Sequence, residues 1–461
     1  MYRFSRARTG ALLGVAALLV AACGSSSKSA TTTAAASAAA STTTAAATAT
    51  TAAAVSTTAA KAAASSSSAV ATTAAPADPL GKKTPADKSK SVVKLGYMWS
   101  GVSPAVDNSS DEVAADAMVK WINEYSGGFA GHPVEIVKCA SNSDNAVAAA
   151  CAGTFFDAKV QAVMFDVVGE IAPWAGPVEQ AGLPIIGFAS ADASLLPASS
   201  RGTAPDGAPI YIFSNPTAGI GAYPSSLAKE IGAKNSVIDV IDVPAATGPA
   251  QALGPALFAA KGAGNVKVVP ISPTSPDHGP AVQAALKDNP ELWHIIGNPA
   301  YCTASIKALL DAGYKGQISG IANCIDDASK KALGDQWKGI KLSYASGEDP
   351  KNPDYIQFKA ILDKYAAKKI APNGTPVGTY VVWEAARRAF AANPPAGDID
   401  SAAIIATMKA VKGIPMPTVD GATATCDGKA VPGVPIACVA GFSSATMGAG
   451  GIPDGFKGYA G

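Results

Sequence analysis

The pattern of apolar and polar positions after residue 90 alternates between two kinds of segment. The short apolar run Val92–Met98 is typical of a buried strand, and the stretch that follows repeats its apolar residues at helical spacing, as in Val113, Ala117 and Trp121. The same pattern predicts further strands in the stretches PVEIVKC, VQAVMFD, LPIIGFA, SVIDVI, VKVVPI, LWHIIG and QISGI. Short apolar strands that alternate with helices predict parallel sheets covered by helices on both faces.

Start and stop signals place the predicted helices. Ser109 and Glu112 match a capping box at the start of the first helix, and the pair Gly127-Gly128 ends it. Further helices are predicted over residues 144–156, 172–180, 223–231, 250–260, 281–287 and 304–312, and within the stretches TYVVWEAARRAFAA and GDIDSAAIIATMKAVKG.

The number of these units predicts two lobes. Residues 91–461 exceed the roughly 250–300 residues that one hydrophobic core usually supports. Two successive runs of four or five units indicate an α/β protein with two doubly wound, Rossmann-like lobes and a cleft between them, where ligands bind at the carboxyl ends of strands. We expect an N-terminal lobe of residues 91–213 plus 342–420 and a C-terminal lobe of residues 214–341 plus 421–461.

The N-terminus resembles a bacterial lipoprotein signal. Basic residues Arg3, Arg6 and Arg8 precede the apolar run 11–22, which is shorter than the ~20 residues of a membrane-spanning helix, and small residues lead into Cys23. This resemblance to the lipobox implies that residues 1–22 are a signal peptide and that Cys23 carries a diacylglycerol. The protein is then anchored to the outer surface of the cell membrane. The alternative is an ordinary secretory signal with a chance cysteine.

The next segment has the composition of a tether. Residues 30–75 are nearly all Ala, Thr and Ser, with no side chains large enough to form a core, so we expect residues 23–90 to be a disordered linker. An Ala-rich helix is the alternative, although Ser and Thr hydroxyls disfavour it. The formal net charge of +1 gives no indication of a nucleic-acid partner, and no second long apolar segment follows.

The cysteines are odd in number, seven in all, which leaves one unpaired in an exported protein. Lipidation of Cys23 removes that problem. Proximity in the sequence favours three disulfides among the rest: Cys139 with Cys151, Cys302 with Cys324, and Cys426 with Cys438. A metal site is the rival interpretation, but there is no CxxC motif, and the three histidines lie at no ligand spacing.

Four stretches together resemble a known family. They are VKLGYMWSG, INEYSGGFAGHPVEIVKC, VEQAGLPIIGFASADASL and TYVVWEAARRAFAA, in this order. In them the chain resembles the type I periplasmic binding proteins, in particular the branched-chain amino acid receptors of ABC transporters. The resemblance implies a monomeric receptor without a cofactor, which closes on a small solute and docks onto a permease and an ATPase on other chains.

The resemblance also implies a set of ligand-binding positions. Carried over residue by residue, they are Trp99, Ser100, Val168, Gly169, Glu170, Ala189, Ser190, Ala191, Thr247, Asn298, Tyr301 and Asn323. Two departures set this chain apart. The loop at Glu170 lacks the family's hydroxyl group for a ligand carboxylate, and Asn323 stands where an acidic partner for a ligand ammonium is expected, with Asp326 nearby. An uncharged group there does not offset a buried ammonium.

Several of these side chains also have a structural interpretation. Trp99 and Trp174 could pack at the rim or in the core, and Glu170 could serve only as a charge at a helix N-terminus. Tyr301 could pack on the neighbouring disulfide, and Asn323 could be a turn residue.

Three other functional classes compete with a transport receptor. An enzyme is disfavoured because the chain has no GxSxG, HExxH or Walker motif. A structural cell-envelope lipoprotein would have no binding cleft. A ligand sensor that signals to a partner instead of a permease is not distinguished from a transport receptor by the sequence. The Gly- and Pro-rich end, residues 414–461, is expected to be a looped extension that a disulfide holds together.

Overall fold

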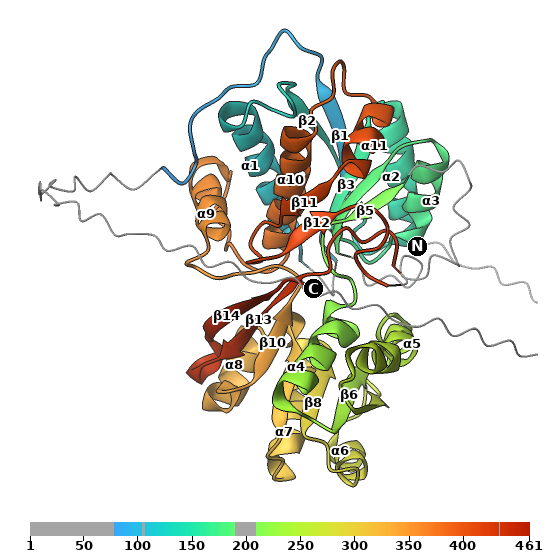
Figure 1. Cartoon of the computed structure of the whole chain (residues 1–461), viewed down its shortest axis with the longest axis vertical. Coiled ribbons are helices and arrows are strands. Elements are labelled where there is room, and N and C mark those ends of the chain that lie inside the picture. The colour runs from blue at the N-terminus through green and yellow to red at the C-terminus, as the bar shows by residue number, and fades with distance from the viewer. Residues whose placement is uncertain (1–77, 104–106, 190–208, 433) are drawn as a thin grey trace, which may run out of the picture. The chain divides into compact units, whose positions relative to one another are not determined.

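The computed structural model describes residues 78–461 except 104–106, 190–208 and 433 (Figure 1). The first sheet has five parallel strands in the order β2-β1-β3-β4-β5. Their bounds are β1 (Val93–Trp99), β2 (Val134–Ala140), β3 (Ala162–Val167), β4 (Ile185–Ala189) and β5 (Ile210–Ile212). We call this sheet and the helices packed on it the first lobe.

Side chains alternate between the two faces of the first sheet, as a strand requires. Tyr97 and Met164 enter a core formed with α1 (Ser109–Tyr125), α9 (Pro353–Tyr365), α10 (Thr375–Ala392) and α11 (Ser401–Lys409). Met98 and Phe165 enter a second core formed with α2 (Asn145–Asp157) and α3 (Ala172–Gln180). Helices thus cover both faces, which explains why these strands are almost entirely apolar.

The second sheet has seven strands in the order β14-β13-β10-β9-β8-β6-β7. The strands β6 (Asn235–Ile241), β7 (Asn265–Ile271), β8 (Leu292–Ile296), β9 (Gln317–Ile321) and β10 (Lys341–Tyr344) are parallel. The last two, β13 (Phe442–Met447) and β14 (Pro453–Tyr459), extend the sheet in antiparallel pairing.

Helices cover both faces of this sheet too. One face packs on α4 (Tyr223–Ile231) and α5 (Pro244–Lys261), and the other on α6 (Gly279–Leu286), α7 (Pro299–Asp311) and α8 (Asp327–Leu333). The sheet and these helices form the second lobe. The α/β class with two doubly wound lobes is therefore confirmed.

The parallel strands of both lobes share one topology. The order β7-β6-β8-β9-β10 repeats the order β2-β1-β3-β4-β5 of the first lobe. In such a sheet, successive connections leave in opposite directions at the point between the first and third strands. These switch points lie between β1 and β3 and between β6 and β8.

The chain passes between the lobes three times: after β5, after β10, and before β13. Two of these crossings contact each other, because the amide group of Asn215 donates to the carbonyl oxygen of Ala440 at 2.7 Å. The expected lobe boundaries were wrong at two places. The break expected after residue 341 falls inside β10, which pairs in the second sheet.

The second boundary error concerns the segment expected to join the C-terminal lobe at residue 421. The hairpin β11 (Lys412–Pro415) and β12 (Thr423–Thr425) packs into the first core, and the N–H group of Cys438 donates to the carbonyl oxygen of Ile212. Only residues from 442 onward pair in the second sheet. The end of the chain, where the sequence had indicated only loop, therefore contains the strands β12, β13 and β14.

The start of the folded region also lies earlier than expected. The N–H group of Ala86 donates to the carbonyl oxygen of Asn123, and the carbonyl oxygen of Leu80 accepts from the indole of Trp121 at 3.0 Å. Lys83 forms an ion pair with Glu124 at 2.6 Å. The described residues 78–90, which we had assigned to the tether, thus pack on the first lobe through backbone hydrogen bonds that composition does not reveal. Residues 1–77 lie outside the described residues.

Among the helix starts that differ from the sequence signals, those of α1 and α5 have clear physical reasons. Ser109 is the first residue of α1 instead of its cap, and the preceding Asn108 forms no side-chain cap, so the expected capping box is wrong. The carboxylate of Asp107 accepts from the Ser109 N–H group instead, at 3.0 Å. Helix α5 begins at Pro244, six residues before the expected start at Ala250, because proline fits the first turn of a helix.

All three expected disulfides are present. The S–S distances are 1.94 Å for Cys139–Cys151, 2.09 Å for Cys302–Cys324 and 1.98 Å for Cys426–Cys438. The first joins β2 to α2, the second joins α7 to the turn after β9, and the third closes the segment that follows β12. None of the helices among the described residues is both long and apolar enough to span a membrane.

The Cys302–Cys324 bond should stabilise the second lobe by restricting the unfolded chain. We expect the double substitution Cys302→Ser and Cys324→Ser to lower the free energy of unfolding by ~3 kcal/mol, as the chain-entropy account gives for a loop of this size. Urea titrations of oxidised and variant protein measure the difference. Equal unfolding midpoints would contradict the prediction.

Candidate functional site

The first switch point brings together two predicted loops. Trp99 is the last residue of β1 and Ser100 follows it, and residues 168–170 follow β3. The hydroxyl group of Ser100 donates to the carbonyl oxygen of Val167 at 3.1 Å, which ties the first loop to the end of β3. Trp99 is 7% exposed and stacks on Tyr97 with ring centroids 5.6 Å apart, so most of its ring belongs to the core.

Gly101 allows the loop after β1 to approach its neighbour. Its φ is +67°, and a Cβ atom there would lie 2.2 Å from Oδ1 of Asn142. Both facts favour glycine, because other residues rarely adopt this φ and have no room for a side chain. The same Oδ1 atom accepts from the Val102 N–H group at 3.2 Å, so the loops after β1 and β2 hold each other in place.

Glu170 is held by a serine that sequence reasoning did not select. The hydroxyl group of the buried Ser141 donates to Oε2 of Glu170 at 2.7 Å. Glu170 also lies two residues before the first residue of α3, where a helix dipole favours negative charge. Both the structural interpretation and a ligand contact through its second carboxylate oxygen fit this position.

A buried polar network lies directly beneath these loops. Asp166 in β3 accepts from the hydroxyl groups of Tyr97 and Thr379, each at 2.8 Å, and from the Val167 N–H group at 2.6 Å. The Thr375 hydroxyl group donates to Oδ1 of Asp111 at 2.6 Å. These contacts join β1, β3, α1 and α10 below the loops.

Burial dominates the electrostatics of this network. It raises the pKa of Asp111 to about 9, with a further contribution from the charge of Asp166, and it also raises the pKa values of Asp166 and Tyr97. Sequence reasoning missed these groups. The sequence did contain a signal for them. Asp166 ends an apolar strand and Asp111 lies on the inner face of a helix, so both carboxyl groups occupy positions where the periodicity predicts core residues.

The other first-lobe predictions include buried, exposed and undescribed residues. Val168 is 1% exposed and packs in the core under α2 and α3, so its side chain is not at the surface of the loop. Gly169 is exposed. Trp174 is fully buried against Phe165 and packs in the core. The side chain of Ala189 and the whole of Ser190 and Ala191 lie outside the described residues.

The second switch point lies between β6 and β8 and contains Thr247 and Asn298. Thr247 is in the first turn of α5, and its hydroxyl group donates to Oδ1 of Asp242 at 3.0 Å, just past the end of β6. Asn298 is the N-cap of α7 and accepts from the Tyr301 N–H group at 2.9 Å. Its side-chain oxygen is thus used in the helix cap, while the residue itself is exposed.

Tyr301 is a core residue. It is 4% exposed, and its hydroxyl group donates to Oδ1 of the buried Asp239 at 2.5 Å. The indole of Trp293 donates to the other oxygen of Asp239 at 3.1 Å. Burial raises the pKa of both Tyr301 and Asp239. The hydroxyl group of Tyr301 therefore fixes α7 to β6 and is turned away from the exposed loop.

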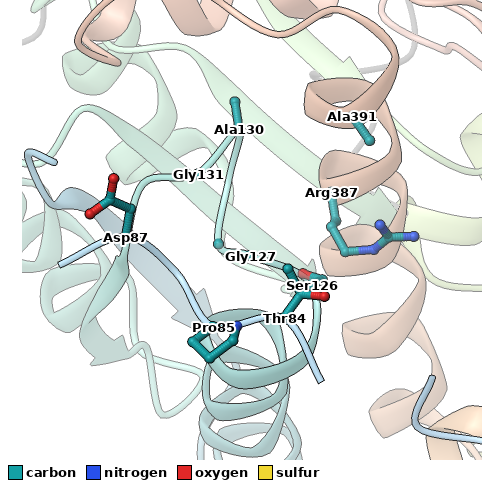
Figure 2. A pocket seen from close by; sticks show the side chains of 10 residues that line it. Thr84, Pro85, Asp87, Ser126, Gly127, Ala130, Gly131, Arg387 and Ala391 are labelled. Atoms are coloured by element: carbon teal, nitrogen blue, oxygen red, sulfur yellow. The ribbon is translucent and has the colours of Figure 1, made fainter. Parts of the chain in front are cut away.

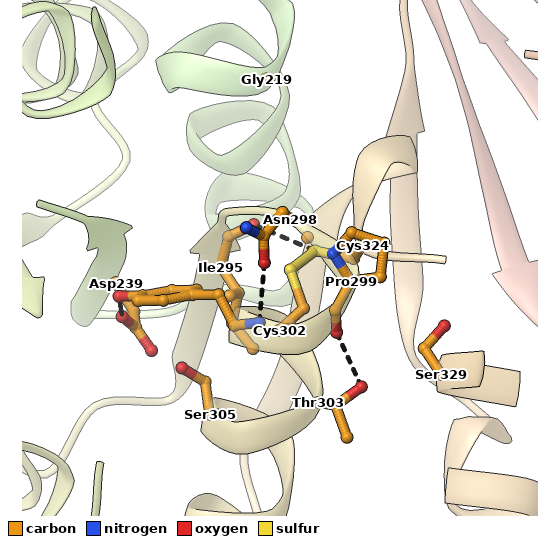
Figure 3. Close-up of a disulfide and its surroundings, with 12 residues drawn as sticks. Gly219, Asp239, Ile295, Asn298, Pro299, Cys302, Thr303, Ser305, Cys324 and Ser329 are labelled. Carbon is orange, nitrogen blue, oxygen red and sulfur yellow. Dashed lines mark hydrogen bonds between the residues drawn. A yellow bond between two sulfur atoms is a disulfide. The ribbon is translucent and has the colours of Figure 1, made fainter. Parts of the chain in front are cut away.

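Asn323 lies beside the disulfide that joins α7 to the turn after β9. It belongs to a short 3₁₀ turn, Ala322–Cys324, and is exposed, and Figure 3 shows Asn298 close to the bonded Cys302 and Cys324. Asp326, the possible substitute for the missing acid, caps α8 by accepting from the Ser329 N–H group. The carboxylate of Asp326 therefore serves as the cap of α8, and Asn323 is the polar side chain of the preceding turn.

A pocket of about 310 Å³ lies elsewhere in the first lobe (Figure 2). Thr84 and Pro85 from the segment before β1, the turn at Ser126–Gly131 and Arg387 of α10 line it. Arg387 is paired with both carboxylate oxygens of Glu384 at 2.6 Å. Because the pocket lies where β1 and β2 begin, it is at the edge of the sheet opposite to the ligand-binding edge of such folds.

No group of three or more His, Cys, Asp or Glu side chains in the described part of the chain is arranged to hold a metal ion.

The sequence profile of the family described as periplasmic binding protein matches residues 92–443. The chain belongs to this periplasmic binding protein family. Membership makes it a solute-binding protein and not an enzyme.

Solved structures share the type I fold of this periplasmic binding protein. One is the branched-chain amino acid transporter substrate-binding protein LivJ from Streptococcus pneumoniae, in complex with isoleucine, with TM-score 0.60, 16% identity, and 80% of this chain and 100% of LivJ covered. Another is the leucine-binding protein LivK from Thermotoga maritima, with TM-score 0.57, 18% identity, and 80% and 98% covered.

A third is a solute-binding protein of an ABC transporter from R. palustris, in complex with 4-hydroxybenzoate, with TM-score 0.60, 19% identity, and 80% and 97% covered. At these identities the likeness shows the fold. Among curated protein sequences, no relative matches this chain.

The contacts of Tyr301 predict that Tyr301→Phe lowers the free energy of unfolding by about 1–3 kcal/mol, because the buried Asp239 loses a donor. Tyr314→Phe is a matched control, since the buried Tyr314 hydroxyl group has no partner in the described structure. Chemical denaturation measures both variants. The structural role assigned to Tyr301 fails if the two substitutions have equal effects.

Proposed function

We propose that this periplasmic binding protein is the extracytoplasmic, lipid-anchored substrate-binding component of an ABC importer. The observation that carries the proposal is the family match across 92–443, a region that contains the parallel strands of both sheets and all three crossings between them. In this proposal the solute binds between the carboxyl ends of the two sheets, and the lobes close on it about the three crossings. Ligand binding is productive because the closed form has the higher affinity.

The ligand-binding surface is proposed from polar groups that lie at the carboxyl ends of strands in both lobes. In the first lobe these are Ser100, the backbone at Gly169, and Glu170, with the edge of Trp99. In the second lobe they are Thr247, Asn298 and Asn323. Each is held by a neighbour or by the end of a strand or helix, as preorganised binding requires.

We propose a small polar solute, an amino acid or a related amide or acid, as the ligand. Asn323 is uncharged, and Asp326 is occupied in a helix cap. A ligand without an ammonium group therefore fits the second lobe better than a free amino acid. The similar fold from R. palustris holds 4-hydroxybenzoate, an acid that has no ammonium group.

The anchor and the partners complete the proposal. Cys23 carries the lipid after removal of residues 1–22, and the Ala/Ser/Thr-rich segment links it to the folded region, which begins by Asp78. A permease and an ATPase on other chains take over the solute, and the receptor acts as a monomer. Two acyl chains give stable membrane anchoring, whereas one gives only marginal binding.

A thermal-shift screen of residues 78–461 tests the proposed binding activity. We expect one class among amino acids, amides, short-chain acids, sugars and aromatic acids to raise stability, by ~2.7 kcal/mol at a hundred times its dissociation constant. We expect acids or amides to act, and free branched-chain amino acids not to. A response to sugars alone would contradict the ligand class, and the absence of any response would count against a solute receptor.

Glu170→Gln should lower the affinity for the ligand found in that screen by about tenfold or more, because a hydrogen bond to a charged group contributes ~1.5–3 kcal/mol. Ser141 can still donate to the glutamine oxygen, so the fold is preserved. Glu135→Gln is the control, an exposed carboxyl group at the amino end of β2. Calorimetric titration compares them, and equal affinities for both variants would remove Glu170 from the site.

Cys23→Ser should abolish membrane anchoring in a bacterial host that processes lipoproteins. The wild-type protein is expected in the detergent phase after phase partitioning, and the variant in the aqueous phase. A variant that still enters the detergent phase would contradict lipidation at Cys23.

A further inference from the structure

The carboxyl group of Asp166 accepts hydrogen bonds from three donors. The hydroxyl groups of Tyr97 and Thr379 donate to Oδ2, and the backbone N–H group of Val167 donates to Oδ1. The residue is fully buried. Three donors around one carboxyl group are the environment of an ionised carboxylate, because each donor stabilises the charged form.

The neighbouring carboxyl group of Asp111 has the opposite environment. Its Oδ1 atom accepts from the Thr375 hydroxyl group at 2.6 Å, while its Oδ2 atom is buried and has no donor in the described structure. An ionised oxygen left without a donor in the core would be costly. A proton on Oδ2 removes this cost, because the group then donates to the adjacent carboxylate of Asp166.

We infer that Asp111 and Asp166 share a single proton, carried by Asp111, and that this proton holds the N-terminal turns of α1 and α10 against the carboxyl end of β3. Asp111 and Asp166 are in this sense positioning residues for the loops of the first lobe. The inference rests on buried contacts within one lobe, and it stands whether or not the proposed ligand is right.

No cation in the described structure neutralises the two carboxyl groups in place of the proton. Neither carboxyl group forms an ion pair with a lysine, arginine or histidine in the described structure. The titratable groups that face each other are Asp111 of α1, Asp166 of β3 and Tyr97 of β1. The other polar side chains that α1 and α10 contribute are the hydroxyl groups of Ser110, Thr375 and Thr379. With no positive charge nearby, the shared proton is what prevents repulsion between two buried carboxylates.

The pH dependence follows from the direction of the shift. The pKa of Asp111 is about 9 in the folded protein and near its ordinary value of 3.8 in the unfolded chain. Between these values the folded state holds one more proton, so the stability that the pair contributes is fully present below pH ~4. It falls as the pH rises, and it is lost once the pH exceeds the folded value.

Asp111→Asn replaces the protonated carboxyl group of Asp111 with an uncharged amide that does not titrate. The amide nitrogen can donate to Asp166 in place of the shared proton, and the amide oxygen can still accept from Thr375. We expect the unfolding equilibrium constant of the wild-type protein, relative to this variant, to rise by up to tenfold per pH unit between about pH 5 and pH 8.5. Urea titrations at a series of pH values measure this ratio.

Asp166→Asn is the matched comparison. It places an amide NH₂ group, itself a donor, among the donors that surround Asp166, so it should destabilise the protein much more than Asp111→Asn at pH 7. Equal effects of the two variants, or a wild-type to Asp111→Asn ratio that does not change with pH, would overturn the inference. If Asp111→Asn does not fold, infrared spectroscopy of the wild-type protein decides. A protonated carboxyl band at pH 7 that disappears at alkaline pH supports the shared proton, and its absence contradicts it.

Discussion

The buried carboxyl group of Asp166 is the point on which the first lobe depends. Tyr97 of β1, Thr379 of α10 and, through the adjacent Asp111, the start of α1 all meet it at the end of β3. The cost of burying a charge is offset only where donors surround it. This requirement fixes four elements relative to one another, and the loops after β1 and β3 begin within three residues of the network. A polar interaction in the core thus determines where the surface loops start.

The second lobe repeats the arrangement with other residues. The buried Asp239 lies in β6 and accepts from Tyr301 of α7 and Trp293 of β8. As in the first lobe, a saturated buried carboxyl group lies near a switch point and fixes a helix to the sheet. The Cys302–Cys324 bond adds a covalent link between the first turn of α7 and the turn after β9. Both proposed binding edges are therefore supported from beneath by fixed polar groups, which keeps the loops in place before a solute arrives.

The sequence predicted the strands β1–β4 and β6–β9, most helices and all three disulfides, because these follow from local periodicity and proximity. It placed the strand-end loops correctly but did not separate loop residues from core residues, as Tyr301 shows: side-chain direction depends on tertiary packing. Asp111 and Asp166 were missed because their importance comes from a contact across 55 positions of the chain, which periodicity does not encode. The same limit explains the misplaced lobe boundaries, since residues 421–440 are held in the first lobe by long-range backbone bonds.

The central claim is that solute binds at the carboxyl ends of both sheets, and not at the pocket beside Arg387. Hydrogen exchange of the protein with and without a ligand that stabilises it tests this most directly. The account predicts slower exchange in two regions together, the loops at residues 99–102 and 168–170 and the loops at residues 298–302 and 322–326. Protection confined to one lobe, or centred on residues 84–87 and 126–131, would contradict it.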